Sequence, residues 1–525
     1  MVSPTEKPEA VLLRPDDNVA VATRSLPRGH HLDLDELSFE TTELIRPGHK
    51  VATRPIEKGG EVRKYGQVIG FAANDVAVGN WVHVHNCSAD AFTREYEYAT
   101  EVPDMPESSE GRTFMGYPRA DGRVGTRNYV AIISTVNCSA STSKLIADSF
   151  PKDELEKFEN VDGLLPITHK TGCGMQFDGP DHLQLNRVLA GYARHPNIAA
   201  YLIVGLGCEV SQSSHLLENQ KLVTVEGLGQ GGSNGSEAKT EKPIHISIQE
   251  SGGIRKTVQA GVKALSKLLP RVNDVKRVEA PASKILLGLQ CGGSDGNSGI
   301  TANPAVGVAS DLLVAQGGTS VLGETTEIYG AEHLLTRRAT RREVGEKLIE
   351  RIRWWEWYTS TFNAEINNNP SPGNKEGGLT TIYEKSLGAI AKGGSSPLTS
   401  VLEYAEPITE RGLAIMDTPG YDPASLTGIV AGGANVCVFT TGRGSVYGCK
   451  PSPCLKIATN STLYERMTDD MDVNAGRILE GTPLQEVGQE IFDEILAVAS
   501  GKPTKSEAQG IGEEEFSPWI IGPTL

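Results

Sequence analysis

The sequence lacks the features of secreted, membrane and nucleic-acid-binding proteins. Its start, MVSPTEKPEAVLL, has no basic segment before an apolar core. No uncharged apolar run reaches the roughly 18 residues that a membrane helix needs. Positive charge is also in deficit, with 50 Lys and Arg against 66 Asp and Glu and a net charge of −16. Because an acidic chain is repelled by nucleic acid and anionic membranes, we expect a cytoplasmic protein with neither partner.

Aromatic residues are scarce, at 6%, whereas glycine is abundant, with 58 of the 525 residues. Many glycines allow tight turns and close approach of the backbone to a ligand, as in α/β enzymes. The eight cysteines lie in a chain without a secretion signal. We therefore expect reduced thiols that pack, bind metal or catalyse, and no disulfides.

The residue pattern divides the chain into three parts and a linker. Residues 11–88 alternate short apolar runs with glycine turns, which predicts a small β-rich domain whose last strand is Trp81–His85. Residues 89–115 are polar and contain proline, as a linker does. Residues 116–275 and 283–525 alternate apolar strands, small-residue turns and helical stretches. This alternation predicts two α/β domains with parallel or mixed sheets.

Four cysteines share one local setting, a short turn near the end of a predicted strand. They lie in VNCS, TGCGM, GLGCE and QCGGSDG, and are Cys138, Cys173, Cys208 and Cys291. Ligands bind at this edge of open α/β sheets, and thiolates suit iron, zinc or an iron–sulfur cluster. The alternative is packing, because buried cysteine is a common small apolar residue. Packing is the expectation for Cys87, Cys437, Cys449 and Cys454.

Histidines supply a second set of candidates. His83 and His85, two residues apart, would lie on one face of a strand within reach of one metal, or face solvent on an edge strand. His169, four residues before Cys173, could be a base, a metal ligand or a buried hydrogen-bonded residue. His49 lies in RPGHK, beside Lys50 as an anion contact.

Two loops offer groups for an anionic ligand. NPSPGNK contains Lys375, which could hold a carboxylate or act as a base. TTGRG follows an apolar run and offers the Thr441 hydroxyl, backbone N–H groups and the Arg443 guanidinium. The segment GLGQGG, with Gly227, Gly229 and Gly232, fits a dinucleotide-binding pattern. The polar residues after it do not predict the helix that holds a pyrophosphate, so we expect no nucleotide site.

Several long motifs together resemble the altronate/galactarate dehydratase family, over residues 17–502. They include RPGHKVA, KYGQVIGFA, VHVHN, GYPRADGRVGTRN, QCGGSDGNSGITANPAVG, NPSPGNKEGGL and TTGRG. The resemblance implies that residues 11–88 form a SAF domain of β-clip fold, and VHVHN is more similar to the altronate branch. It also implies a hydro-lyase that dehydrates D-altronate to 2-keto-3-deoxygluconate. Galactarate or another sugar acid is the alternative substrate, and a non-catalytic sugar-acid-binding protein is the alternative class.

The resemblance also implies Fe²⁺, with Mn²⁺ as the alternative ion, held as a mononuclear centre or in an iron–sulfur cluster. A base would remove the proton next to the carboxylate, and the β-hydroxyl would leave as water. The candidate proton-transfer residues are His49, His169 and Lys375. Candidate substrate contacts are Lys50, Asp295, Asn303, Thr441 and Arg443. Candidate metal ligands are His83, His85, Cys138, Cys173, Cys208 and Cys291. The cysteines could instead line the substrate pocket while the two histidines hold the ion. A large acidic metabolic enzyme is also expected to form a homo-oligomer.

Overall fold

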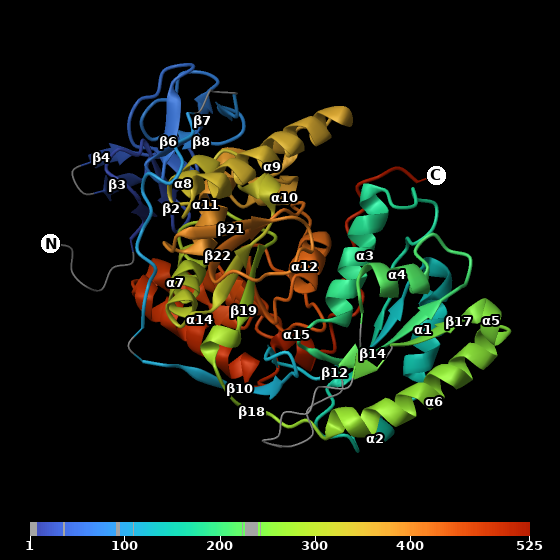
Figure 1. The fold of residues 1–525 in the computed structure, drawn as a ribbon. Coiled ribbons are helices and arrows are strands. Elements are labelled where there is room, and N and C mark those ends of the chain that lie inside the picture. Colours follow the sequence, from blue (N-terminus) through green and yellow to red (C-terminus); the bar gives the residue numbers. More distant parts are fainter. Residues whose placement is uncertain are drawn as a thin grey trace.

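The computed structural model describes residues 8–34, 37–90, 95–108, 110–222, 224–225, 240–241 and 243–524, which form three folded regions (Figure 1). The N-terminal region consists of small antiparallel sheets, as predicted. One contains β1 (Ala10–Val11), β2 (Val19–Ala22), β5 (Lys50–Ala52) and β8 (Trp81–Val82). The others pair β3 (His31–Leu34) with β4 (Leu37–Glu40), and β6 (Glu61–Lys64) with β7 (Gln67–Ala72) and β9 (Cys87–Ser88).

The last predicted strand of this region is shorter than expected. Strand β8 ends at Val82, because Asn86 closes a turn immediately after it. The Asn86 Oδ1 accepts the His83 N–H at 2.8 Å, and its Nδ2 donates to the Trp81 carbonyl at 2.9 Å. His83 is buried whereas His85 is exposed. The prediction that both histidines share one strand face is therefore wrong.

Residues 95–108 run along the C-terminal domain, where the N–H groups of Ala99 and Glu101 donate to the Thr336 and Arg337 carbonyls, each at 3.0 Å. A small antiparallel sheet follows, in the order β11 (Val124–Gly125), β10 (Thr113–Pro118) and β18 (Val278–Pro281). Because β10 precedes the central domain and β18 follows it, this sheet holds both of its connections together.

The central domain contains a four-stranded parallel sheet, in the order β13 (Gly163–Ile167), β12 (Tyr129–Ser134), β14 (Ile198–Gly205) and β17 (Ile244–Ser247). Alternate β12 side chains face opposite sides. Val130 and Ile132 pack with α6 (Ile254–Asn273) beside α1 (Asn137–Asp148), while Ala131 and Ile133 pack with α3 (Pro180–Ala193). The shorter elements are α2 (Lys152–Leu155), α4 (Ser213–Asn219), α5 (Ile248–Ser251) and the pair β15 (Thr224–Val225) and β16 (Thr240–Glu241). The GLGQGG segment lies outside the described residues.

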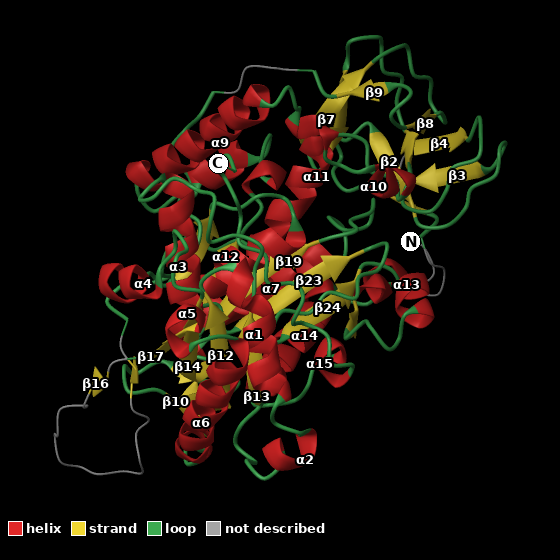
Figure 2. Ribbon diagram, turned by 90° about the vertical axis from the view of Figure 1, so that its right-hand side faces the viewer, coloured by secondary structure: helices red, strands yellow, loops and turns green. Residues whose placement is uncertain are grey.

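The C-terminal domain contains a seven-stranded parallel sheet (Figure 2). The order is β21 (Leu398–Leu402), β22 (Gly412–Met416), β20 (Thr319–Leu322), β19 (Leu286–Cys291), β23 (Val436–Thr441), β24 (Cys454–Ala458) and β25 (Val473–Asn474). The helices are α7 (Ala302–Ala315), α8 (Glu332–Arg337), α9 (Arg342–Thr361), α10 (Pro372–Glu376), α11 (Ile382–Ala389), α12 (Asp422–Ala431), α13 (Ser461–Arg466), α14 (Leu484–Ala499) and α15 (Lys505–Ala508).

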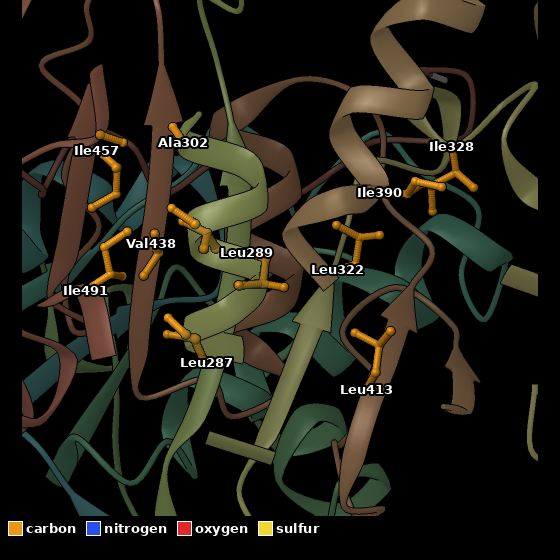
Figure 3. Close-up of a cluster of buried hydrophobic side chains, with 14 of the residues drawn as sticks. Leu287, Leu289, Ala302, Leu322, Ile328, Ile390, Leu413, Val438, Ile457 and Ile491 are labelled. Carbon is orange, nitrogen blue, oxygen red and sulfur yellow. The ribbon is translucent and has the colours of Figure 1, made fainter. Parts of the chain in front are cut away.

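Both faces of this sheet are covered. Leu287, Leu289 and Val438 belong to an apolar cluster with Ala302 of α7 and Ile491 of α14 (Figure 3). On the opposite face, Cys437 and Phe439 pack with Leu426 and Ile429 of α12. Two-sided burial explains why these strands are nearly continuous apolar runs. The predicted α/β class with a small β domain is confirmed, and no helix of the described chain has the length and apolarity to cross a membrane.

Helices α3 and α12 join the central and C-terminal domains. At their ends Gly191 lies directly against the Ala431 backbone, where a side chain would overlap it. Near their starts, the Trp519 carbonyl accepts from Gln184 at 2.7 Å, and its N–H donates to the Tyr404 hydroxyl, which itself donates to Ala424 O. The two helices therefore run in the same direction, so the carboxyl edges of both sheets face the same side.

The C-terminal segment, residues 513–522, returns from the C-terminal domain to cover part of the central domain. Phe516 packs edge-on against Tyr192, with ring centroids 4.6 Å apart. Glu514 forms a 2.6 Å ion pair with Lys144 of α1. This segment thus fastens the two domains together beyond the helix contact.

Candidate active site

Loops rich in glycine bring the N-terminal domain onto the carboxyl edge of the seven-stranded sheet. Gly48, with φ of +80°, lies between the loop after β19 and the end of α10. A side chain at Gly296 or Gly378 would overlap the Gly48 carbonyl. The Gly296 N–H donates to the Gly377 carbonyl at 2.8 Å. The motifs RPGHK, SDGNSG and NKEGG, far apart in sequence, therefore meet at one place.

A cavity of about 690 Å³ lies at this junction. Its lining includes Arg46 and His49 from the N-terminal domain, and Asp295, Asn297 and Arg443 from loops after β19 and β23. The chain continues from β19 to β20 on one side and returns to β23 on the other, so the strand order reverses between β19 and β23. Ligands of open α/β sheets bind in the crevice at such a reversal.

The charge of the cavity differs from that of the whole chain. The chain has a net charge of −16, whereas four arginines and three carboxylates line the cavity: Arg24, Arg46, Arg443 and Arg466 against Asp295, Glu376 and Glu480. Arg24 pairs with Glu9, and the Arg443 Nη2 lies 3.4 Å from the Glu376 carboxylate. Guanidinium groups bind carboxylates through paired N–H donors. The cavity therefore suits an anionic ligand.

Asp295 organises the floor of the cavity. Its carboxylate accepts hydrogen bonds from Thr459 and Ser298 at 3.0 Å and from Asn460 at 3.2 Å. Burial raises the pKa of Asp295, an effect that these hydrogen bonds oppose. The neighbouring Asn297 Oδ1 is buried without a hydrogen-bond partner. An unpaired buried amide oxygen is costly, so a ligand hydroxyl is a favourable partner for it.

His49 is buried at the wall of the cavity, with both ring nitrogens engaged. Its Nδ1 accepts from the Trp81 indole N–H at 3.1 Å, so its Nε2 carries the proton and donates to the Glu376 carbonyl at 3.0 Å. Burial lowers the pKa of His49. The ring is therefore a neutral hydrogen-bond donor. It can donate to a ligand in place of Glu376 without gaining or losing a proton.

The predicted anion contact Lys50 is fully buried and already paired. Its Nζ lies 2.8 Å from the Glu384 carboxylate and 2.6 Å from the Gly378 carbonyl. Lys64 pairs with the same carboxylate at 2.9 Å. This buried triad joins the N-terminal domain to α11. The geometry favours a structural role for Lys50.

Three other predicted residues lie around the cavity without lining it. Asn303 is held between the Gly388 carbonyl and the Thr440 hydroxyl, and the Thr441 hydroxyl accepts the Gly444 N–H at 3.1 Å. Both therefore shape the loops beneath the site. Lys375 lies half-buried on α10, next to the lining residue Glu376. Its predicted role stays a prediction.

The predicted metal ligands divide into separate places. His83 is buried beside His49, with ring centroids 5.1 Å apart, and its Nδ1 has no hydrogen-bond partner. Burial lowers the pKa of His83 to about 3. Cys291 is buried in the C-terminal domain, whereas Cys138, Cys173 and Cys208 are exposed on the central domain. The four cysteines do not form one site. The other four are buried, as expected of packing residues.

Cys291 belongs to a buried polar cluster that the sequence analysis missed. Its Sγ lies 3.3 Å from Glu324 and 3.4 Å from Glu327, in an arrangement that could suit a metal. However, the Lys392 Nζ lies 2.7 Å from Cys291 Sγ, and Lys385 Nζ lies 2.6 Å from Glu327. Two ammonium groups already supply the positive charge, so these residues do not fit a metal ion.

Glu324 is the unusual member of this cluster. Its φ of 60° is left-handed, an uncommon conformation for a non-glycine residue, and its Oε1 is buried without a partner. Burial, and then the nearby Glu327 carboxylate, raise the pKa of Glu324 to about 8. The signal in the sequence was GETTE after a strand, two carboxylates three residues apart.

His169 lies in the central domain, apart from the cavity. Its Nε2 donates to the Ser134 carbonyl at 3.0 Å, and its Nδ1 accepts the Thr171 N–H at 3.2 Å. Burial lowers the pKa of His169 to about 4. With both nitrogens engaged, the geometry favours a structural role.

Family models match almost the whole chain. The SAF domain of altronate/galactarate dehydratases matches residues 8–90, the second domain of D-galactarate dehydratase/altronate hydrolase matches 116–273, and the C-terminal domain of D-galactarate/altronate dehydratases matches 282–524. The chain belongs to the altronate/galactarate dehydratase family. The resemblance and the predicted hydro-lyase class are thereby confirmed.

Individual relatives of this family member match over similar lengths. It is 35% identical to altronate dehydratase of Bacillus subtilis over 507 residues, covering 96% of this chain and 97% of the relative. It is 36% identical to altronate dehydratase of Escherichia coli over 498 residues, covering 95% and 96%. Galactarate dehydratase (L-threo-forming) of E. coli is 39% identical over 471 residues, covering 88% of each chain.

Proposed function

We propose that this hydro-lyase removes water from a six-carbon sugar acid, with D-altronate as the substrate and 2-keto-3-deoxygluconate as the product. The observation that carries the proposal is the arginine-lined cavity at the reversal of strand order. Family motifs from two domains meet there, and four arginines line it in a chain of net charge −16. Its volume of about 690 Å³ leaves ample room for a hexonate.

The cavity residues match the parts of such a substrate. Arg443 and Arg46 would hold the carboxylate, which also increases the acidity of the adjacent C–H bond. Asn297 and Asn460 would bind hydroxyl groups, and Asp295 would keep both amides in position. His49 would donate its Nε2 proton in a hydrogen bond to the substrate, exchanging the Glu376 carbonyl for a substrate oxygen.

The family resemblance implies iron, which as a Lewis acid would assist departure of the β-hydroxyl. Among the predicted ligands, Cys291 does not fit a metal ion, because the Lys392 ammonium already lies 2.7 Å from its Sγ. The exposed thiols of Cys138, Cys173 and Cys208 fit iron in type and accessibility.

Galactarate is the second candidate, because one pair of arginines comes from the N-terminal domain and the other from the C-terminal domain, where Arg443 follows β23 and Arg466 ends α13. A diacid would contact both pairs, whereas a monoacid needs one. A cytoplasmic location and a homo-oligomeric state remain predictions.

The test is product formation by anaerobically prepared, iron-supplemented protein with D-altronate, galactarate and epimeric aldonates. We expect a 2-keto-3-deoxy acid from D-altronate. If the protein instead prefers galactarate, the assigned substrate changes but the dehydration reaction does not. Thermal stabilisation by these acids without any product would contradict the proposal and indicate a binding protein. Arg342→Gln, at a surface ion pair of α9, is the control for variants in the cavity.

A further inference from the structure

The central domain presents three thiols along one edge of its sheet. Cys138 follows β12, Cys173 follows β13 and Cys208 follows β14, and these are adjacent parallel strands. All three are exposed, whereas the five other cysteines are buried. Cysteine is among the residues most often buried, so three exposed thiols at one edge need an explanation other than packing.

Backbone contacts hold the three cysteine segments together, with Cys138 in the first turn of α1 and Cys173 and Cys208 in loops. The Asn137 N–H donates to the Thr171 carbonyl at 2.9 Å, which joins the first segment to the second. The Ser211 N–H donates to the Gly172 carbonyl at 3.1 Å, which joins the second to the third. Gly172, with φ of +97°, lies so close to Thr135 that a side chain would overlap its carbonyl. Each cysteine is within three residues of one of these contacts.

A buried carboxylate fixes the third loop. Glu209 accepts hydrogen bonds from the Gly207 N–H at 2.5 Å, the Leu206 N–H at 3.1 Å and the Thr135 hydroxyl at 2.8 Å. Glu209 is thus turned inward while its neighbour Cys208 is exposed. The Gln249 amide donates to the Cys208 Sγ at 3.3 Å. Such second contacts orient a ligating thiolate and tune its basicity.

The spacing of the thiols distinguishes two kinds of metal site. The three Sγ atoms do not all lie within 4.8 Å of one another, unlike the ligand atoms of Cys291, Glu324 and Glu327. Thiolates on one tetrahedral ion with metal–sulfur bonds of about 2.3 Å would be roughly 3.8 Å apart. Thiolates on different irons of a cluster are farther apart. Thiols of which at least one pair is more than 4.8 Å apart do not suit a single ion, whereas a cluster accepts thiolates that are farther apart.

We propose that Cys138, Cys173 and Cys208 bind a [4Fe–4S] cluster at the carboxyl edge of the central sheet. Three protein thiolates leave one iron without a protein ligand, which is the open position that a catalytic metal needs. This role in hydroxyl departure rests on the proposed function, but cluster binding does not. Because α3 and α12 run in the same direction, this edge faces the same side as the carboxyl edge of the seven-stranded sheet.

A second group of possible metal ligands lies near the three thiols. Asp178 lies in the loop after Cys173, His182 on α3 and His215 on α4, and their ligand atoms lie within 4.8 Å of one another. However, Asp178 N–H already donates to His182 Nδ1 at 3.0 Å, and Asn186 lies 3.2 Å from the other ring nitrogen. Substitutions in each group separate a thiol site from a histidine site.

The experiment measures iron, acid-labile sulfide and the visible absorption of the full chain after anaerobic purification and reconstitution. We expect about four irons and four sulfides per chain, with broad sulfide-to-iron absorption. Cys138→Ser, Cys173→Ser and Cys208→Ser should each lose most of the iron and sulfide. Cys291→Ala and His215→Gln should keep both. A thermal melt checks that each variant is folded.

Iron without sulfide, or iron retained in the triple Cys→Ser variant, would overturn the cluster. Loss of metal in His215→Gln but not in the cysteine variants would move the site to the histidines. If the cluster is present but no sugar acid is dehydrated, the proposed function fails while the metal site stands. If protein without the cluster still dehydrates a sugar acid, the proposed function stands and the role of the cluster in hydroxyl departure fails.

Discussion

The carboxyl edges of the two parallel sheets are built from similar strands but present opposite chemistry. At the C-terminal domain, Cys291 is buried against the Lys392 ammonium, and loops at the same edge line a cavity that contains arginines. At the central domain, Cys138, Cys173 and Cys208 are exposed. The strand ends alone thus do not determine what an edge binds. The charges that approach from other elements decide it, since lysines of α11 and the following turn reach only the first edge.

The largest expected effect is at the buried edge. Lys392→Met would remove the ammonium that lies 2.7 Å from Cys291 Sγ and 3.3 Å from Glu324, and would leave the ionised Glu327 with Lys385 alone, while keeping the side-chain length. Removing one partner of a buried pair costs about 3–5 kcal/mol, and we expect the free energy of unfolding to fall by that amount in urea titration. Lys347→Met, at a surface pair with Glu406, is the control and should change stability by less than about 1 kcal/mol. A similar loss in both variants would contradict the internal neutralisation of this edge.

Next in size is the loss of the carboxylate contact above that edge. Arg443→Gln removes a guanidinium of the cavity but no buried pair, since its side chain is 48% exposed. We expect kcat/KM for the sugar acid to fall about 100-fold, or about 2.7 kcal/mol, with little change in the melting temperature. Unchanged kcat/KM would place the carboxylate elsewhere.

At the thiol edge, Gly172→Ala tests the close packing of the cysteine loops. The substitution adds a side chain at φ of +97° and against Thr135, so we expect a loss of about 1–3 kcal/mol in unfolding free energy. Iron content should fall with it, because the loop that carries Cys173 must move. Gly122→Ala, also at positive φ but with open space around it, separates backbone strain from crowding.

The last effect concerns acid stability at the same edge and is confined to low pH. Burial lowers the pKa of His169 from 6.5 to about 4, so the unfolded chain binds the proton first. This contribution to stability is complete above pH 6.5 and is lost as the pH falls toward 4, by at most about 1.4 kcal/mol per pH unit. His169→Gln should therefore flatten the pH dependence of unfolding in this window. An unchanged slope would show that His169 is not the group responsible.

Strand positions and motif locations could be predicted from the sequence, because buried parallel strands are apolar runs that end in small-residue turns. Strand β12 (Tyr129–Ser134), for example, ends shortly before Cys138, as the predicted strand-end setting of this cysteine requires. Side-chain roles were less predictable. Lys50 has the residue type of an anion contact, but its partner Glu384 is 334 positions away. Likewise, His83 and His85 were predicted to share a strand face because they are two residues apart. The side chain of Asn86 instead closes a turn there, and the spacing of apolar residues does not predict such a contact.

The return of residues 513–522 onto the central domain sets an order on synthesis. Ribosomes make the α3 surface, with Tyr192, more than three hundred residues before Phe516, the ring that covers it. The central domain is therefore made well before the residues that shield this apolar surface. A chain that terminates before residue 513 would leave the ring of Tyr192 without Phe516.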